Sequence, residues 1–401
     1  MHSGRLVTLP MARAKIRAQV RVVMLCWSLW SGCQNAADRA KPKPRRVTEL
    51  APATVSFLIP AASPLEWSQA ILSALKHIER PATRESVCAV IAIIAQESNF
   101  KANPAVPNLA QVVKARLTAY EAKYGRPGKA LMASLLDARS LKDKKTFAQR
   151  LKTVRTERDL DLTFRDMLAY HKSTHPFVFT AANVAGRVFD GRTLEELNPI
   201  ATAGSMQVSV AFAETWADDH GIPEATARDS LYTIAGGVLY GTARLFDHEA
   251  AYGEMIYRFA DYNAGLYASR NAAFQIQLAR LLGQPLTPDG DLLQYDEDGD
   301  SSSNESQTYD ALKQFARRFA KDLSPWRIRR DVELEKKGTF EQTDTYKAVK
   351  AAFGKKFKSS PRYAVLPQAE IDSPKLRRKR STVTYAQAAQ RQYDACLGNE
   401  P

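Results

Sequence analysis

The stretch Ala89–Phe100, AVIAIIAQESNF, is an almost unbroken apolar run that ends at one carboxylate, Glu97. Val90 and Ile93 lie seven and four positions before Glu97, so on a helix all three side chains share one stripe that faces the core. Burial disfavours the charged form of a carboxyl group, and we therefore expect the pKa of Glu97 to be raised. Such a group is suited to general-acid catalysis near neutral pH. On this stretch alone, a helix-terminal glutamate that turns to solvent or meets an arginine is the alternative.

Two later stretches place polar residues at expected turns. AGSMQVS covers Ala203–Ser209, and FADYNAG covers Phe259–Gly265. Each is weak alone, because Gly-Ser is typical of a turn and Asn-Ala-Gly of a helix end. In this order, however, E-S, G-x-M-Q and Y-N-A-G resemble the signature of the lytic transglycosylases and the wider lysozyme-like superfamily. The resemblance covers roughly residues 65–282.

This resemblance implies a mainly α, lysozyme-like fold and cleavage of peptidoglycan glycan strands. It implies that Glu97 is the sole catalytic carboxylate, which protonates the glycosidic oxygen between N-acetylmuramic acid and N-acetylglucosamine. The same residue would then act as base while the sugar's 6-hydroxyl closes a 1,6-anhydro ring, unlike the usual two-carboxylate scheme. No cofactor and no metal are expected. The residues that match the family's substrate-binding positions are Ser98, Gln207, Tyr262 and Asn263.

The sequence departs from the family pattern at several positions. Gly204 lies 107 residues after Glu97, whereas family members place G-x-M-Q much closer to the glutamate. We explain this spacing by a helical insertion between about residues 103 and 199. Ser205 and Asp261 stand where leucine and alanine are common, and Asp261 would either raise the pKa of the acid further or face solvent. These departures favour the alternative function, a non-catalytic peptidoglycan-binding or scaffolding lipoprotein.

The N-terminal segment resembles a bacterial lipoprotein signal. A basic stretch, Arg13–Arg21, precedes the apolar run Val22–Trp30, and two small residues precede Cys33. The apolar run is too short to span a bilayer. We expect cleavage before Cys33 and lipidation of that cysteine, and Gln34 implies sorting to the outer membrane. The protein would then be periplasmic and lipid-anchored; a buried N-terminal helix is the alternative.

Two cysteines besides Cys33 would remain in the mature chain. Cys88 and Cys396 would be able to pair in an oxidising periplasm. Cys88 also lies in the apolar run, where a free buried thiol is equally plausible. The sequence does not decide between a disulfide and a free thiol at Cys88.

At 401 residues, the chain is long enough for two domains or for one domain with large insertions. Helical periodicity dominates and few strand patterns occur. The chain is predicted to begin with a lipoprotein signal peptide at 1–32 and a tether at 33–62. A lysozyme-like catalytic core follows at 63–283, with the helical insertion at about 103–199. An acidic surface loop at 284–308 then precedes a basic helical C-terminal region at 309–401.

Several helix boundaries are expected from local signals. SPLE, Ser63–Glu66, predicts a capping box and a helix to about Glu79. This helix is expected to bury Leu65, Ile71, Leu72 and Leu75. PATRES, Pro81–Ser86, begins the helix that carries Glu97. Further helices are expected at 108–124, 129–138, 144–171, 209–218, 225–248, 255–262, 272–282 and 385–397.

Three other motifs have ordinary explanations. His171 and His175 have the spacing of metal ligands, but no third ligand is evident nearby. The acidic run Asp296–Glu305 has its glycine too early for an EF-hand. The basic run Lys375–Arg380 would bind phosphate backbones only in another compartment, so we expect no nucleic-acid partner. The formal net charge of +14 includes several cations of the signal segment.

Overall fold

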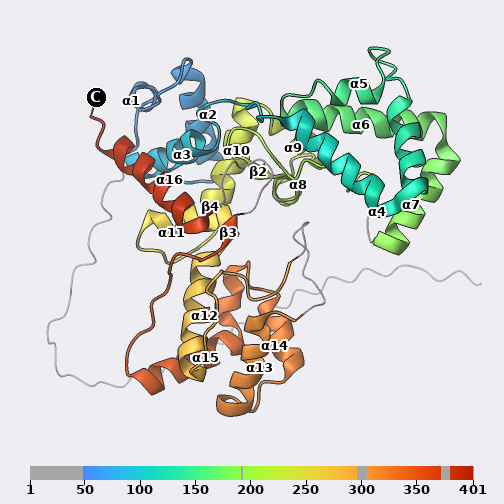
Figure 1. The fold of residues 1–401 in the computed structure, drawn as a ribbon. Helices are drawn as coiled ribbons and strands as arrows, with labels where there is room; N and C mark the ends of the chain where they lie inside the picture. Colours follow the sequence, from blue (N-terminus) through green and yellow to red (C-terminus); the bar gives the residue numbers. More distant parts are fainter. Residues whose placement is uncertain (1–47, 191–192, 296–304, 372–379, 401) are drawn as a thin grey trace, which may run out of the picture. The chain divides into compact units, whose positions relative to one another are not determined.

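The structure, a computed structural model, describes residues 48–190, 193–295, 305–371 and 380–400. In these residues the chain is mainly α-helical, which confirms the predicted mainly α class (Figure 1). The described strands form two short antiparallel pairs. None of the described helices combines the length and the apolar character needed to cross a bilayer. The predicted signal peptide, 1–32, and residues 33–47 of the tether lie outside the described residues.

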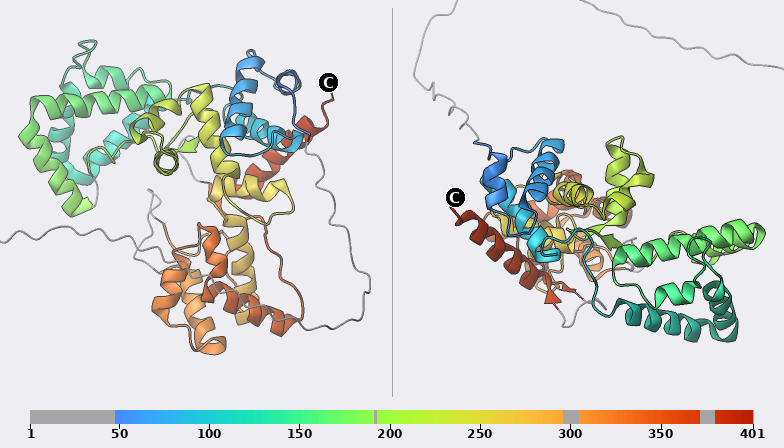
Figure 2. Two further views of the ribbon diagram at one scale, coloured as in Figure 1. Left: turned by 180° about the vertical axis from the view of Figure 1, so that it is seen from behind. Right: turned by 90° about the horizontal axis from the view of Figure 1, so that it is seen from above.

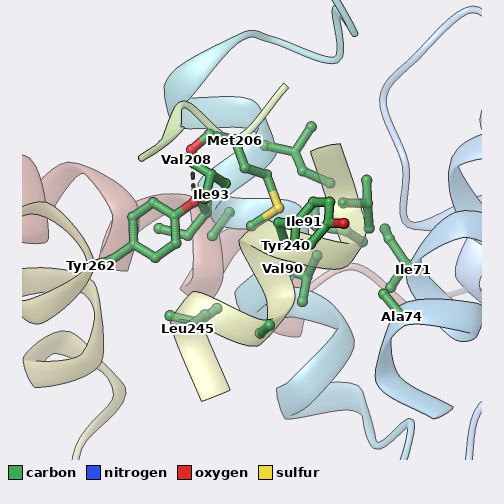
Figure 3. Packing of buried hydrophobic residues seen from close by; sticks show 14 of the residues in the cluster. Ile71, Ala74, Val90, Ile91, Ile93, Met206, Val208, Tyr240, Leu245 and Tyr262 are labelled. Carbon is green, nitrogen blue, oxygen red and sulfur yellow. Dashed lines mark hydrogen bonds between the residues drawn. The ribbon is translucent and has the colours of Figure 1, made fainter. Parts of the chain in front are cut away.

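The first core is a hydrophobic cluster formed mainly by helices before residue 265 and by the last helix of the chain. Ile93, Met206 and Tyr240 pack together within it, as Figure 3 shows. Outside residues 103–199, the helices of the first core are α1 (Pro52–Phe57), α2 (Pro64–His77), α3 (Arg84–Glu97), α8 (Val210–Asp219), α9 (Glu224–Ser230), α10 (Ile234–Phe246), α11 (Met255–Ala264) and α16 (Thr382–Leu397). Two short strand pairs accompany them: β1 (Thr202–Ala203) with β2 (Val208–Ser209), and β3 (Glu370–Ile371) with β4 (Arg380–Ser381).

Helix α3 carries the apolar run and is central to this core. Thr83 caps its N-terminus by accepting a hydrogen bond from the Ser86 amide at 3.2 Å. Every residue from Val87 to Ile94 is buried, so the helix is covered on all sides rather than along one stripe. The expected helix is confirmed, and Glu97 is its last residue.

The range predicted as the insertion, residues 103–199, contains four helices in its described parts, 103–190 and 193–199, and we call this range the insertion. The backbone of Val106 donates to the Arg155 carbonyl at 2.9 Å, which closes the base of the insertion. The expected break between residues 124 and 129 is a kink at Gly125, where φ is +61°. The helices are α4 (Leu109–Asp137), α5 (Phe147–Leu151), α6 (Glu157–Thr174) and α7 (Pro176–Asp190).

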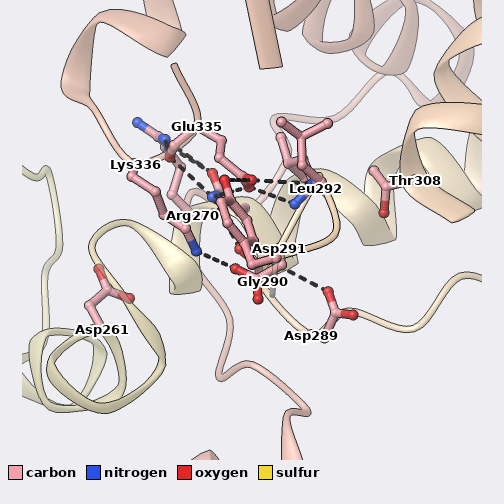
Figure 4. A network of polar contacts seen from close by, with 12 residues as sticks. Asp261, Arg270, Asp289, Gly290, Asp291, Leu292, Thr308, Glu335 and Lys336 are labelled. Atoms are coloured by element: carbon pink, nitrogen blue, oxygen red, sulfur yellow. Dashed lines mark hydrogen bonds and ion pairs between the residues drawn. The ribbon is translucent and has the colours of Figure 1, made fainter. Parts of the chain in front are cut away.

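A second core gathers the helices that follow the Y-N-A-G motif. A buried polar network joins it (Figure 4): the Arg270 guanidinium donates to the carbonyls of Glu335 and Lys337, and the Glu335 carboxylate accepts the Leu292 amide at 2.5 Å. Burial raises the pKa of Glu335 to about 7. The elements are α12 (Ala268–Leu282), α13 (Gln307–Phe319), α14 (Pro325–Val332), the 3-10 helix η1 (Gly338–Gln342) and α15 (Asp344–Phe357).

Helix α16 does not join the second core but packs on α3 and α11 in the first (Figure 2). A disulfide between Cys88 and Cys396 fixes it to α3, which decides between the two readings of these cysteines. The region predicted at 309–401 is therefore divided: its earlier helices belong to the second core and its last helix to the first.

Three local expectations differ from the structure. The tether was predicted to extend to residue 62, but α1 forms within it and buries Val55 because apolar side chains there reach the first core. Ser63 makes no side-chain cap, and Leu65 is 59% exposed, since Trp67 takes the buried position instead. The predicted acidic loop, 284–308, has no helix over residues 284–295, but α13 begins within its range at Gln307. Leu292 is fully buried, so the range is no simple surface loop.

Candidate functional site

Glu97 lies at the C-terminal end of α3 with its side chain half-buried. The phenol of Tyr385, from α16, donates a hydrogen bond to Glu97 Oε1. Burial, reinforced by the charge of Glu97, raises the pKa of Tyr385 well above its usual value, so the phenol keeps its hydrogen at neutral pH. Oε1 is therefore an acceptor, and a proton on this carboxyl group would sit on Oε2.

Tyr262 joins the second and third motifs. Its hydroxyl donates to the Met206 carbonyl at 2.7 Å, and Figure 3 shows this bond next to Ile93, one turn before Glu97 on α3. Burial raises the pKa of Tyr262, and the charge of Glu97 raises it further. Because this electrostatic effect requires proximity, the three motif segments meet around Glu97.

Gln207 is held by the insertion. Its Nε2 donates to Glu157 Oε2 at 2.8 Å and to the Gly204 carbonyl at 3.2 Å. Glu157, the first residue of α6, is only 1% exposed. The Thr202 hydroxyl lies 3.3 Å from Gln207 Oε1. The insertion thus contacts the G-x-M-Q motif directly.

Asn263 and Ser98 also make intramolecular contacts. Asn263 Oδ1 accepts a hydrogen bond from the Thr382 hydroxyl of α16 at 3.0 Å. Ser98 Oγ donates to the Ile94 carbonyl and accepts from the Lys101 amide, both at 3.2 Å. Ser98 therefore terminates α3, and its expected contact with substrate stays a prediction.

Arg244 of α10 adds a cation to this site. Its Nε donates to the Tyr262 carbonyl at 3.2 Å. Burial lowers the pKa of Arg244, while the nearby phenols of Tyr262 and Tyr385 and the charge of Glu97 offset part of that effect. A guanidinium near the candidate acid would stabilise a carboxylate there, and this effect opposes the raised pKa that burial predicts for Glu97.

The two departures from the family pattern are both buried. Asp261 accepts from the Tyr252 hydroxyl at 2.5 Å and from the Ser269 amide at 2.7 Å, and burial raises its pKa to about 6. The alternative in which Asp261 faces solvent is wrong, since Asp261 is fully buried and joins α11 to α12. Ser205 Oγ has no hydrogen-bond partner among the described residues, and a Cβ on Gly237 would lie 2.7 Å from it. The small side chain of Ser205 thus lets the G-x-M-Q segment pack closely against α10.

Sequence patterns missed four residues of this site. Glu157 and Thr382 lie far from the motifs along the chain, as does Tyr385, and no local pattern distinguishes them from surface residues. Arg244 lies between the second and third motifs along the chain, and neither motif includes it.

The histidine pair makes ordinary contacts. The rings of His171 and His175 stack with centroids 6.2 Å apart, and a His171 nitrogen lies 3.4 Å from the Leu135 carbonyl. Within the described part of the chain, no group of three or more potential ligands is arranged to hold a metal ion.

The fold and these contacts define a mainly α-helical protein in which the three motif segments and a C-terminal helix gather near one carboxylate. The helical range predicted as an insertion contacts the second of these motifs through Glu157. The chain belongs to the family described as "Protein of unknown function (DUF1615)", which matches residues 61–399. It is similar to "Uncharacterized protein YaiW" of Escherichia coli (strain K12), with 33% identity over 378 residues, 92% of this chain and 94% of that protein. No solved structure matches the chain. The matched range includes every residue of the site described above.

Proposed function

We propose that this protein is a lytic transglycosylase-like muramidase that cleaves peptidoglycan with Glu97 as its single acid and base. The observation that carries this proposal is the hydrogen bond from Tyr262 to the Met206 carbonyl beside Glu97. It joins the G-x-M-Q and Y-N-A-G segments, 56 residues apart, at the end of the helix that carries E-S. Proximity of these three segments is what the resemblance requires.

In the proposed reaction, Glu97 Oε2 delivers its proton to the glycosidic oxygen as the bond from C1 to that oxygen breaks. Because Tyr385 occupies Oε1, the orientation of the carboxyl group is fixed. The resulting carboxylate then takes the proton of the sugar's 6-hydroxyl while the oxygen of that hydroxyl bonds to C1. An anhydro sugar forms, and Glu97 is protonated again. Arg244 would stabilise the negative charge on Glu97 between the two steps. The raised pKa of Glu97 stays a prediction.

Digestion of purified sacculi tests this proposal. Wild-type protein is expected to release anhydromuropeptides, and Glu97→Gln is expected to release none above background. Glu85→Gln is the matched control, because Glu85 is exposed on the first turn of the same helix. The proposal fails if wild-type protein releases no anhydromuropeptides or if Glu97→Gln releases as much as Glu85→Gln.

A non-catalytic glycan-binding lipoprotein is the second candidate. The side chains of Gln207 and Asn263 are both held by hydrogen bonds within the protein, as suits a rigid binding site. Wild-type protein that sediments with sacculi but releases no anhydromuropeptides would favour this function.

We also propose that the protein is periplasmic and carries a lipid anchor at Cys33. Replacement of this cysteine tests the anchor. The Cys88–Cys396 disulfide supports an oxidising compartment. Cys33→Ser is expected to move the protein from the membrane fraction to the soluble periplasmic fraction. Unchanged membrane association of Cys33→Ser would contradict the anchor.

A further inference from the structure

Gln207 has a fixed amide orientation. Its Nε2 lies near two oxygens, Glu157 Oε2 at 2.8 Å and the Gly204 carbonyl at 3.2 Å. A backbone carbonyl only accepts hydrogen bonds, so the amide nitrogen must be the atom that faces it. Both hydrogens of the amide group therefore have partners within the protein. The atom left to meet a ligand is Oε1.

Oε1 retains the capacity to accept a hydrogen bond. The Thr202 hydroxyl lies 3.3 Å away, at the long end of hydrogen-bond distances, and an amide oxygen has two lone pairs. Gln207 is half-buried rather than enclosed. Toward a ligand, the side chain is thus an acceptor and not a donor.

Two separate sets of contacts fix the start of α6, and therefore Glu157, against neighbouring segments. Before the helix, Thr156 accepts a hydrogen bond from Asn103 Nδ2 at 3.1 Å, and it pairs with Ala105 in an isolated β-bridge. One turn later, Asp161 accepts from Arg228 at 3.1 Å. The position at the helix N-terminus also favours a carboxylate.

We infer that Glu157 is a positioning residue of the proposed glycan site, which holds Gln207 so that Oε1 accepts a hydrogen bond from an N-acetylated sugar. The donor would be the acetamido N–H or a ring hydroxyl. The inference rests on the proposed function for its ligand class, and it gives the insertion a role in recognition. Glu157 acts through Gln207 and does not touch the sugar.

Affinity for soluble N-acetylglucosamine oligomers, measured by calorimetry, tests this inference apart from catalysis. Glu157→Met is expected to weaken binding about tenfold, since it removes one well-aligned hydrogen bond that fixes Gln207. Glu157→Gln is expected to restore binding to within about threefold of wild type, because its amide oxygen still accepts from Gln207 Nε2. Asp161→Asn is the matched control, since it weakens the docking of α6 without touching Gln207.

A double-mutant comparison separates positioning from a general loss of structure. If Glu157 acts through Gln207, Glu157→Met has no further effect on affinity in a Gln207→Met background. Equal affinity of Glu157→Met and wild type, or an equal loss in Asp161→Asn, overturns the inference, as does wild-type protein that binds no oligomer. Binding that depends on Glu157 without release of anhydromuropeptides would leave the inference standing and remove only the catalytic proposal.

Discussion

Tyr385 donates a hydrogen bond to Glu97 although 288 residues separate them in the sequence. The helix that carries Tyr385 also supplies Thr382, which donates to Asn263, and Cys396, which is bonded to Cys88 on α3. One C-terminal helix therefore contacts both the first and the third motif. The surroundings of the candidate acid depend on the two ends of the family-matched region together.

Replacement of Tyr385 by phenylalanine is expected to lower the rate of anhydromuropeptide release. A hydrogen bond to a charged group contributes about 1.5–3 kcal/mol, so the expected loss in kcat/KM is about 10- to 100-fold. Tyr393→Phe removes a buried phenol two turns further along the same helix and is expected to retain activity. Equal rates for the two variants in the sacculus assay would show that the contact of Tyr385 with Glu97 has no catalytic importance.

Reduction of the disulfide is expected to destabilise the first core and to impair the site. Cys88 and Cys396 are 308 residues apart and both buried, and loss of a native disulfide costs about 2–5 kcal/mol of folding free energy. Urea unfolding with and without dithiothreitol measures this cost. A Cys88→Ser, Cys396→Ser double variant should match the reduced protein and no longer respond to the reductant. Identical unfolding curves for oxidised and reduced wild-type protein would contradict the expectation.

Local sequence signals were sufficient for α3 and for the existence of most other described helices. The Thr83 cap and the apolar run fix α3, and both act within a few residues of each other. The single helix expected at 225–248 is instead α9 and α10, because the chain turns at Leu231, whose carbonyl approaches Gly204. That turn depends on tertiary packing, which no local pattern encodes. Helix α7 was missed because no helix was predicted between residues 171 and 209.

The same distinction applies to the candidate site. Tyr262 and Glu97 carry motif signals, and the structure brings them together. Glu157 and Tyr385 carry none, because their importance arises only from contacts across 50 and 288 residues. Long-range pairs of this kind become visible only when the fold is known.

Gly204, in the second motif, is expected to tolerate no side chain. Its φ is +82°, and an added Cβ would lie 2.1 Å from the Leu231 carbonyl oxygen. Strain and overpacking together suggest that Gly204→Ala lowers the free energy of unfolding by about 3 kcal/mol or more. Gly253→Ala is the control, because its Cβ would meet nothing within 4 Å and its effect should stay within about 0.5 kcal/mol. A pair of alanine variants with the same melting temperature would refute this account of the motif glycine.

Asp261 is expected to make the stability of the protein depend on pH. Burial raises the pKa of this carboxyl group from 3.8 to about 6, although Tyr252 and Ser269 donate hydrogen bonds to it, and Figure 4 shows it near the polar network of the second core. Since the folded pKa lies above the unfolded one, the stabilisation is fully present below pH 3.8 and is lost as the pH rises through 6. Over that window, the unfolding free energy of the wild type should fall by about 3 kcal/mol relative to Asp261→Asn. Urea titrations of both proteins from pH 4 to 8 measure the difference, and parallel pH profiles would mean that Asp261 has an ordinary pKa in the folded state.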